Sequence, residues 1–216
     1  MELAMGTLEA LSLAMGTAWT SGINLYATVA ALGIAGRLQM IALPPDLEVL
    51  THPLVIAVAC VMYVVEFFAD KVPYVDSGWD VLHTFIRVPA GAILAARSLG
   101  DLNPALELAA VLAGGTVALA AHATKAATRL AINVSPEPFS NWAASVAEDL
   151  TVLGSLWMIF NHPLIMLLLV AAFTAAVAWL TPRLFRLARR GFRALRERLR
   201  GAKSDEPVLP GATPSS

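Results

Sequence analysis

Long apolar stretches alternate with short polar links along the chain. A helix that crosses a membrane needs roughly 20 apolar residues, and six stretches meet or approach that length. The pattern therefore predicts an all-α, polytopic helical membrane protein of about six spans. The predicted spans are Gly6 to Gly36, Pro53 to Ala69, Val81 to Leu99, Ala105 to Ala121, Trp142 to Phe160 and Pro163 to Leu180.

The third stretch fits a span least well. His83, Arg87 and Pro89 lie near its start, so it could instead re-enter the membrane or lie at the interface, which would leave five spans. The second and sixth stretches are better delimited, because each begins with a His-Pro pair, at Pro53 and at Pro163. Proline is favoured in the first turn of a helix, so both pairs are interpreted as helix starts.

The first stretch is too long for one straight span. Its 31 residues would extend about 46 Å at 1.5 Å per residue, against a hydrocarbon core of roughly 30 Å. We expect an interruption near residues 19–24, where small and polar residues gather. Gly114 and Gly115 could mark a matching interruption in the fourth stretch, as in transporters with inverted repeats. The alternative is that these glycines serve close helix packing.

Composition supports a membrane protein, and the charge is uneven. Hydrophobic residues make up 57% of the chain, charged residues 14%, and mean hydropathy is +0.68. Nine of the fifteen Lys and Arg residues lie between Arg183 and Lys203. This segment is typical of a basic amphipathic helix on anionic lipid head groups, and a nucleic-acid role is not expected. The predicted divisions are a transmembrane domain, 1–181, a basic cytoplasmic helix, 182–203, and a disordered tail, 204–216.

Basic residues also suggest an orientation, since cytoplasmic flanks of spans are enriched in Lys and Arg. With six spans and both termini inside, only Arg37 and Arg97 face out. We therefore expect a cytoplasmic C-terminus. The residues expected on the cytoplasmic side are Lys71, Arg87, Lys125, Arg129 and the basic tail.

Ionisable residues cluster in three places at or just inside the expected cytoplasmic ends of spans. Such groups are costly inside a membrane and are candidates for a functional site. Buried charges must also be paired. The predicted pairs are Glu148 or Asp149 with Lys125 or Arg129, and Glu66 or Asp70 with Arg87.

No metal site or cofactor is expected. Carboxylates suit hard cations, but their spacing is not diagnostic, and the four histidines are scattered. The sequence also contains no phosphate-loop glycine pattern, zinc-protease motif or nucleophile elbow.

The same stretches resemble a bacterial family of small multi-pass membrane proteins, the domain of unknown function 4126 family. The resemblance implies a multi-pass membrane protein and no established activity. From the resemblance we expect a basic residue in many members at the position where this chain has Asn24. The resembling residues are 21–26, 70–73, Asp76, 87–91, His122, Lys125, Arg129, 138–141, Ser145, Glu148 and Asp149.

The lead hypothesis is a small transporter or channel-like carrier of a small molecule or ion, not an enzyme, with a charged site on the cytoplasmic half of the membrane. The alternatives are an intramembrane enzyme acting on a lipid head group and a scaffold whose charges only pair. We expect the chain in the bacterial cytoplasmic (inner) membrane, with homo-oligomerisation open. The candidate substrate-binding residues are Asn24, Glu66, Asp70, Arg87, His122, Lys125, Arg129, Glu148 and Asp149.

Overall fold

The computed structural model describes residues 6–72, 75–133 and 138–204, and they are helical with no strand among them. Their contacts divide the chain into two units, Met1–Ala175 and Ala176–Ser216. The division falls inside the last helix. The elements are α1 (Thr7–Arg37), the 3₁₀ helix η1 (Pro45–Thr51), α2 (Pro53–Ala69), α3 (Val75–Ser98), α4 (Pro104–Asn133), α5 (Pro138–Asn161) and α6 (Pro163–Ser204).

Local chemistry sets where the helices begin and end. The His52 ring accepts a hydrogen bond from the Leu54 amide at the start of α2, where Pro53 occupies the first turn. The Asn103 side-chain oxygen likewise accepts hydrogen bonds from two backbone amides at the start of α4. Gly100 follows the end of α3 with a φ of +70°, a backbone conformation in which glycine has no steric penalty. The predicted helix starts at Pro53 and Pro163 are confirmed.

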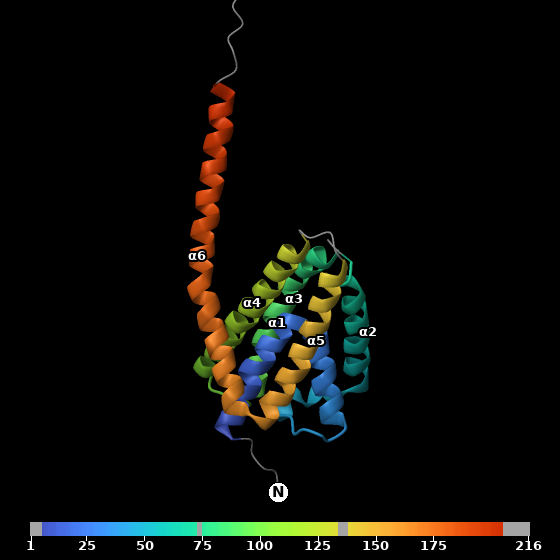
Figure 1. Cartoon of the computed structure of the whole chain (residues 1–216). Helices are drawn as coiled ribbons and strands as arrows, with labels where there is room; N and C mark the ends of the chain where they lie inside the picture. The colour runs from blue at the N-terminus through green and yellow to red at the C-terminus, as the bar shows by residue number, and fades with distance from the viewer. Residues whose placement is uncertain (1–5, 73–74, 134–137, 205–216) are drawn as a thin grey trace, which may run out of the picture. The chain divides into compact units, whose positions relative to one another are not determined.

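Helix α1 forms the centre of the first unit. It packs against each of α2, α3, α4 and α5, and Figure 1 shows it running between them. Its buried hydroxyls, such as those of Thr17 and Ser21, donate to carbonyls one turn back in the same helix. These groups are thereby satisfied away from water. α1 is therefore surrounded by protein along most of its length.

The expected interruption of the first helix is present. Asn24 has φ −146° and ψ 99°, so two helical segments meet there. α4, by contrast, runs as one helix through Gly114 and Gly115. A Cβ added at Gly114 would collide with Ala95 of α3. The close-packing interpretation therefore describes Gly114, and the matching interruption in α4 is absent.

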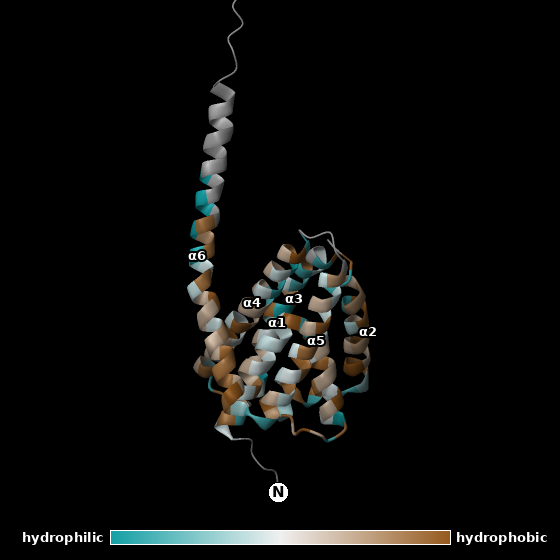
Figure 2. Cartoon of the chain, viewed as in Figure 1, coloured by the Kyte–Doolittle hydropathy of each residue, from teal (hydrophilic) through white to brown (hydrophobic). Residues whose placement is uncertain are grey.

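The apolar helices indicate a membrane protein. Among the described residues, α4, Phe139–Asn161 of α5 and Pro163–Leu187 of α6 are long and apolar enough to cross a membrane. The pair η1 and α2, bent by 65°, is a fourth candidate. Large apolar side chains are exposed along these helices, and Figure 2 shows brown residues along α2 and α5. Water-soluble monomers rarely expose apolar surface on this scale.

Two of the six predicted spans, in α1 and α3, are not among these candidates. α1 is rich in small and hydroxyl residues that face other helices, and α3 carries ionisable residues through its first half. The count of six spans stays a prediction. The segment predicted as a separate basic helix continues α6 without a break through Pro182. Of the predicted disordered tail, only Ser204 lies within the described residues.

A buried charge network as candidate functional site

Seven charged side chains from four helical elements are joined by ion pairs inside the first unit. Each pair has a nitrogen and an oxygen within 4 Å of each other. We call this set the charge network. Its members are Glu66 and Asp70 at the end of α2, Asp80 and Arg87 of α3, Lys125 and Arg129 of α4, and Glu148 of α5.

Lys125 lies at the centre of the charge network. Its Nζ atom is 3.2 Å from Glu66 Oε1 and 3.1 Å from Asp70 Oδ2. It is also 3.2 Å from Glu148 Oε2 and 3.9 Å from Asp80 Oδ1. The Lys125 side chain is 2% exposed. One ammonium group therefore connects three helical elements around α4 away from solvent.

The two arginines connect the ends of the network. Arg87 donates to Glu66 and, over 3.2 Å, to Asp80. Arg129 meets Glu148 with two hydrogen bonds, of 2.9 and 2.8 Å, the fork geometry that guanidinium favours. It also contacts Asp70 at 3.3 Å. Both predicted pairings, Glu148 with Lys125 or Arg129 and Glu66 with Arg87, are confirmed.

The sequence positions of these residues explain why they meet. His122, Lys125 and Arg129 of α4 are three and four residues apart and so share one face of the helix. Asp80 and Arg87 are two turns apart on α3. Figure 2 shows teal residues gathered among α3 and α4 within the bundle. Helix periodicity therefore presents charged faces that pack against each other.

His122 lies beside the charge network. Its Nδ1 is 3.3 Å from Arg87 Nη1, and its Nε2 is 2.7 Å from Thr84 Oγ1 and 3.0 Å from the Asp80 carbonyl. The ring is 1% exposed. It therefore holds α4 against the first half of α3.

Asn24 joins the interruption in α1 to the polar region. Its Oδ1 accepts from the Ala27 amide at 2.9 Å, which caps the second segment of α1. Its Nδ2 donates to Asp149 Oδ1 at 3.4 Å. Tyr63 of α2 donates to the other Asp149 oxygen at 3.0 Å. The break in α1 is therefore stabilised by the same carboxylate that links α1, α2 and α5.

Lys71 follows α2 and lies over the ring of Phe67, with its ammonium donating to the Phe67 carbonyl. Burial lowers the pKa of the Lys71 ammonium, and the carboxylates of Asp149 and Asp70 act in the opposite direction. It also donates to Ser145 of α5 at 3.4 Å. Lys71 thus adds a cation beside the network.

Six of the nine predicted site residues are network members, and His122 contacts Arg87 and Asp80. Asn24 and Asp149 bond to each other, and Asp149 directly follows the network member Glu148 in the sequence. The prediction missed Tyr63, Thr84 and Ser145, whose hydroxyls complete its hydrogen bonds. Asp80 is a network member outside the predicted set. Its spacing of seven residues from Arg87 is the sequence signal for it.

Several buried carboxylate oxygens in the network lack a hydrogen-bond donor. Within the part of the chain that the structure describes, this holds for Glu66 Oε2, Asp70 Oδ1 and Asp80 Oδ2. These three side chains are 0%, 3% and 1% exposed. Buried polar atoms are normally satisfied, so three such oxygens close together are an uncommon feature. No group of three or more His, Cys, Asp or Glu among the described residues could hold a metal ion.

A cavity of about 270 Å³ reaches the network from between α4 and α5. Lys125 and Glu148 line it, together with apolar and aromatic side chains that include Trp19 and Phe173. Trp19 and Phe173 pack edge to face with ring centroids 5.7 Å apart. The network is therefore accessible at Glu148, whose side chain is 15% exposed.

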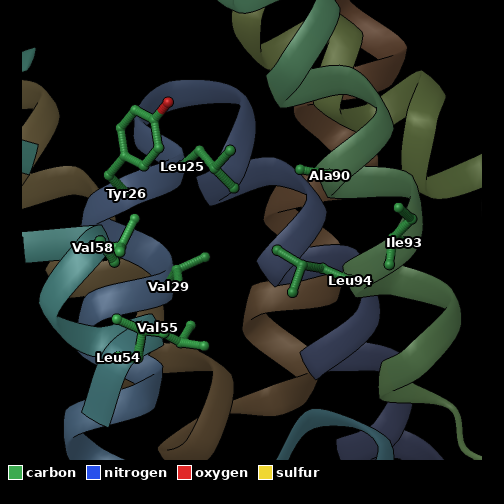
Figure 3. Close-up of a pocket in the computed structure, with 10 residues that line it drawn as sticks. Leu25, Tyr26, Val29, Leu54, Val55, Val58, Ala90, Ile93 and Leu94 are labelled. Carbon is green, nitrogen blue, oxygen red and sulfur yellow. The ribbon is translucent and has the colours of Figure 1, made fainter. Parts of the chain in front are cut away.

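A second, larger cavity of about 490 Å³ is lined by side chains of α1, α2 and α3. Figure 3 shows its wall, with Val29, Val58 and Leu94 among the apolar residues. Tyr26 also lines it, and the Tyr26 hydroxyl bonds to His83 at 3.1 Å. Because its lining carries no charged side chain, this cavity offers no comparable chemistry.

The model of one protein family, described as Domain of unknown function (DUF4126), matches residues 11–183. This range covers most of the chain, so the protein belongs to that family. No curated protein and no solved structure matches the chain.

Proposed function

We propose that this member of the DUF4126 family is a small transporter or channel-like carrier whose binding site is the charge network. The observation that carries the proposal is the position of Lys125 among four carboxylates, enclosed inside a protein with apolar outer helices. Ionisable groups at this depth are costly and are typical of ion and substrate pathways.

The interrupted helix α1 supports this function. Broken helices at binding sites are a recurrent device of membrane carriers, because the freed helix ends present partial charges. The second segment of α1 begins at Asn24, and the Asn24 side chain contacts Asp149 beside the network. A ligand that draws Asp149 away would alter the capping of α1, which couples binding to a movement of the central helix.

The cavity at Lys125 and Glu148 supplies access. Its walls are apolar and its charged lining comes from the network, so a small ion or a polar group can reach Glu148 without unfolding the bundle. The alternative function, a scaffold whose charges only pair, also accounts for the ion pairs. It does not account for the buried oxygens without a donor, which are costly in a purely structural site.

We place the protein in the bacterial cytoplasmic membrane with its C-terminus in the cytoplasm. Exposed arginines in the second unit, including Arg183, Arg186 and Arg189, favour this orientation. Lys71, Arg87, Lys125 and Arg129 then share the cytoplasmic half.

Purified protein tests the proposal in two stages. A thermal-shift screen against ions and small metabolites finds ligands, because a ligand that binds the folded state raises the melting temperature. Uptake of each ligand found is then measured in proteoliposomes, with proton flux recorded by a trapped pH-sensitive dye. The variants are Glu148→Gln, in the network, and Glu107→Gln, the same change at an exposed position of α4.

We expect a ligand shift and a flux that Glu107→Gln retains and Glu148→Gln loses. A screen without a ligand, together with no proton flux in the wild type, would favour the scaffold. An enzyme acting on a lipid head group would instead convert a lipid added to the liposomes, with Glu148→Gln abolishing conversion and leaving lipid binding intact.

A further inference from the structure

The charge network does not balance its own charge. Four carboxylates, from Glu66, Asp70, Asp80 and Glu148, face three cations, from Arg87, Lys125 and Arg129. With every group ionised, the network carries one negative charge in excess, and counting the neighbouring Lys71 and Asp149 leaves this excess unchanged. An uncompensated charge in a low-dielectric interior is expensive, and a carboxyl group commonly takes up a proton instead.

The oxygens without a donor indicate the same chemistry. An ionised carboxylate only accepts hydrogen bonds, whereas a protonated one carries its own donor. Among the described residues, the network leaves one oxygen of Glu66, Asp70 and Asp80 without a partner. A proton on one of these oxygens removes the excess charge, and that oxygen no longer requires a donor from another residue.

Distances to the cations single out one carboxyl group. Glu148 has two bonds to Arg129 and a third contact to Lys125. Asp70 lies within 3.3 Å of Arg129 and 3.1 Å of Lys125. Asp80 is 3.2 Å from Arg87 and 3.9 Å from Lys125. Because attraction falls with distance, the cations stabilise the Asp80 anion least.

Glu66 is the nearest rival for the proton. Its Oε1 atom contacts Arg87 more closely than Asp80 does and lies 3.2 Å from Lys125. Its anion is therefore better compensated. The charged groups that act on Asp80 are Asp70 from the end of α2, Arg87 from α3, Lys125 from α4 and Glu148 from α5. His122 of α4 contacts the Asp80 carbonyl, and Glu66 is joined to Asp80 through Arg87.

We infer that Asp80 Oδ2 is a proton-binding site and that the carrier exchanges this proton with solvent as part of its cycle. The inference rests on the proposed function for its role in a cycle and names the proton as the coupling ion. On release, the Oδ2–H bond breaks, its electron pair stays on Asp80, and the proton passes to water. The resulting anion is held by Arg87 and Lys125.

The pKa of Asp80 agrees with this assignment. Asp80 precedes the predicted span 81–99, and α3 is not among the candidate spans of the structure. Burial raises the pKa of Asp80 to about 6, against the opposing effect of Lys125 and Arg87. Asp80 therefore gains and loses its proton at pH values that a cell can reach.

Infrared spectroscopy tests the inference on the purified full-length protein. A protonated carboxyl group has a C=O stretching band that an ionised one lacks. Spectra are recorded from about pH 5 to about pH 8, a range that brackets the Asp80 transition. The samples are the wild type, Asp80→Asn and the control Glu107→Gln, together with wild type carrying ¹³C in its aspartate side-chain carboxyls.

We expect one protonated-carboxyl band that fades as pH rises, shifts with the aspartate label, persists in Glu107→Gln and is missing from Asp80→Asn. If Asp80→Asn does not fold, labelled Asp80→Glu replaces it, and the band should then lose its sensitivity to the aspartate label. A wild type without a titrating band overturns the inference. So does a band insensitive to the label, because the proton then lies on a carboxyl group that is not an aspartate. A band that sodium chloride abolishes at constant pH also overturns it.

The spectra need no ion gradient, so they separate this inference from the proposed function. A titrating Asp80 band without any flux sustains the proton site and removes the carrier. Flux of a ligand without the band sustains the carrier and removes the proton as its coupling ion.

Discussion

The side-chain amide of Asn24 donates a hydrogen bond of 3.4 Å to Asp149 Oδ1 of α5. Asn24 is the residue at which α1 departs from helical geometry. Asn24 also caps the segment that follows, through its bond from the Ala27 amide. One short side chain therefore both terminates a helix and fixes the terminus against a carboxylate. Alanine at this position would favour a continuous helix, because it has the highest helix propensity and no capping atom.

Replacement of Asn24 by alanine is expected to destabilise the protein by about 1 to 2 kcal/mol, the usual cost of losing a helix cap. The measurement is thermal unfolding in detergent. Asn161→Ala is the control, since Asn161 is exposed at the end of α5 and bonds only a carbonyl of its own helix. Equal melting temperatures for the two variants would show that the Asn24 cap contributes nothing.

Removal of the central cation should be far more damaging. Lys125→Ala leaves four carboxylates facing only two arginines, and breaking a buried ion pair costs about 3 to 5 kcal/mol. A second substitution, Glu148→Gln, removes one of the excess charges and should restore part of the stability. If the double variant is no more stable than Lys125→Ala, the two side chains do not interact as the structure describes.

The same double variant separates a carrier from a scaffold. A scaffold requires only that the charges balance, so restored stability would restore its function. A carrier requires the groups themselves, so the double variant would be folded and inactive in the proteoliposome assay. Recovery of flux together with stability would argue against the site that we propose.

Helix periodicity was sufficient to predict much of the site. The shared face of Lys125 and Arg129 follows from their spacing. The need to pair buried charges then indicated Glu148 or Asp149 as their partner, and Glu66 or Asp70 as the partner of Arg87. Tyr63 was beyond the reach of this reasoning. Its hydroxyl meets Asp149 across 86 positions of sequence, and only the tertiary fold brings them together.

The fold was predicted less completely, for a related reason. Residues 19–24 and Gly114 present the same signal in the sequence, small residues within an apolar stretch, yet only the first site is a break. What distinguishes them is the surroundings. The side-chain amide of Asn24 donates a hydrogen bond to Asp149. Gly114 instead packs closely against Ala95, and an unbroken helix preserves that contact.

Close helix contact at Gly22 leads to a further prediction. A Cβ at Gly22 would collide with the Ala118 carbonyl and come within 2.7 Å of the Ala121 Cβ. Gly22→Ala should therefore push α1 from α4 and destabilise the protein by about 1 to 3 kcal/mol, the usual cost of overpacking.

Gly154→Ala is the matched control for this substitution, because a Cβ at Gly154 meets nothing within 4 Å. It should be neutral or stabilising by up to about 1 kcal/mol, since alanine favours the helix. Comparable destabilisation by both substitutions would mean that glycine acts through backbone flexibility and not through contact with α4.

The last prediction concerns pH and follows from the Asp80 carboxyl. An aspartate in the unfolded chain ionises near pH 3.9, whereas the pKa of Asp80 in the folded protein is raised to about 6. Between these values the folded protein binds the extra proton. Its free energy of unfolding therefore falls as pH rises, by up to about 1.4 kcal/mol per pH unit from this group. The loss is complete once pH exceeds the folded value.

Asp80→Asn cannot ionise and should escape this loss. The melting temperature of Asp80→Asn relative to wild type should therefore increase from about pH 4.5 to about pH 6.5 and then level off. Comparing the two proteins at each pH cancels the contributions of other carboxylates, and Glu107→Gln should show no such trend. A constant difference between Asp80→Asn and wild type would mean that Asp80 is ionised throughout. The excess negative charge of the network would then have to be compensated by something other than a proton on this residue.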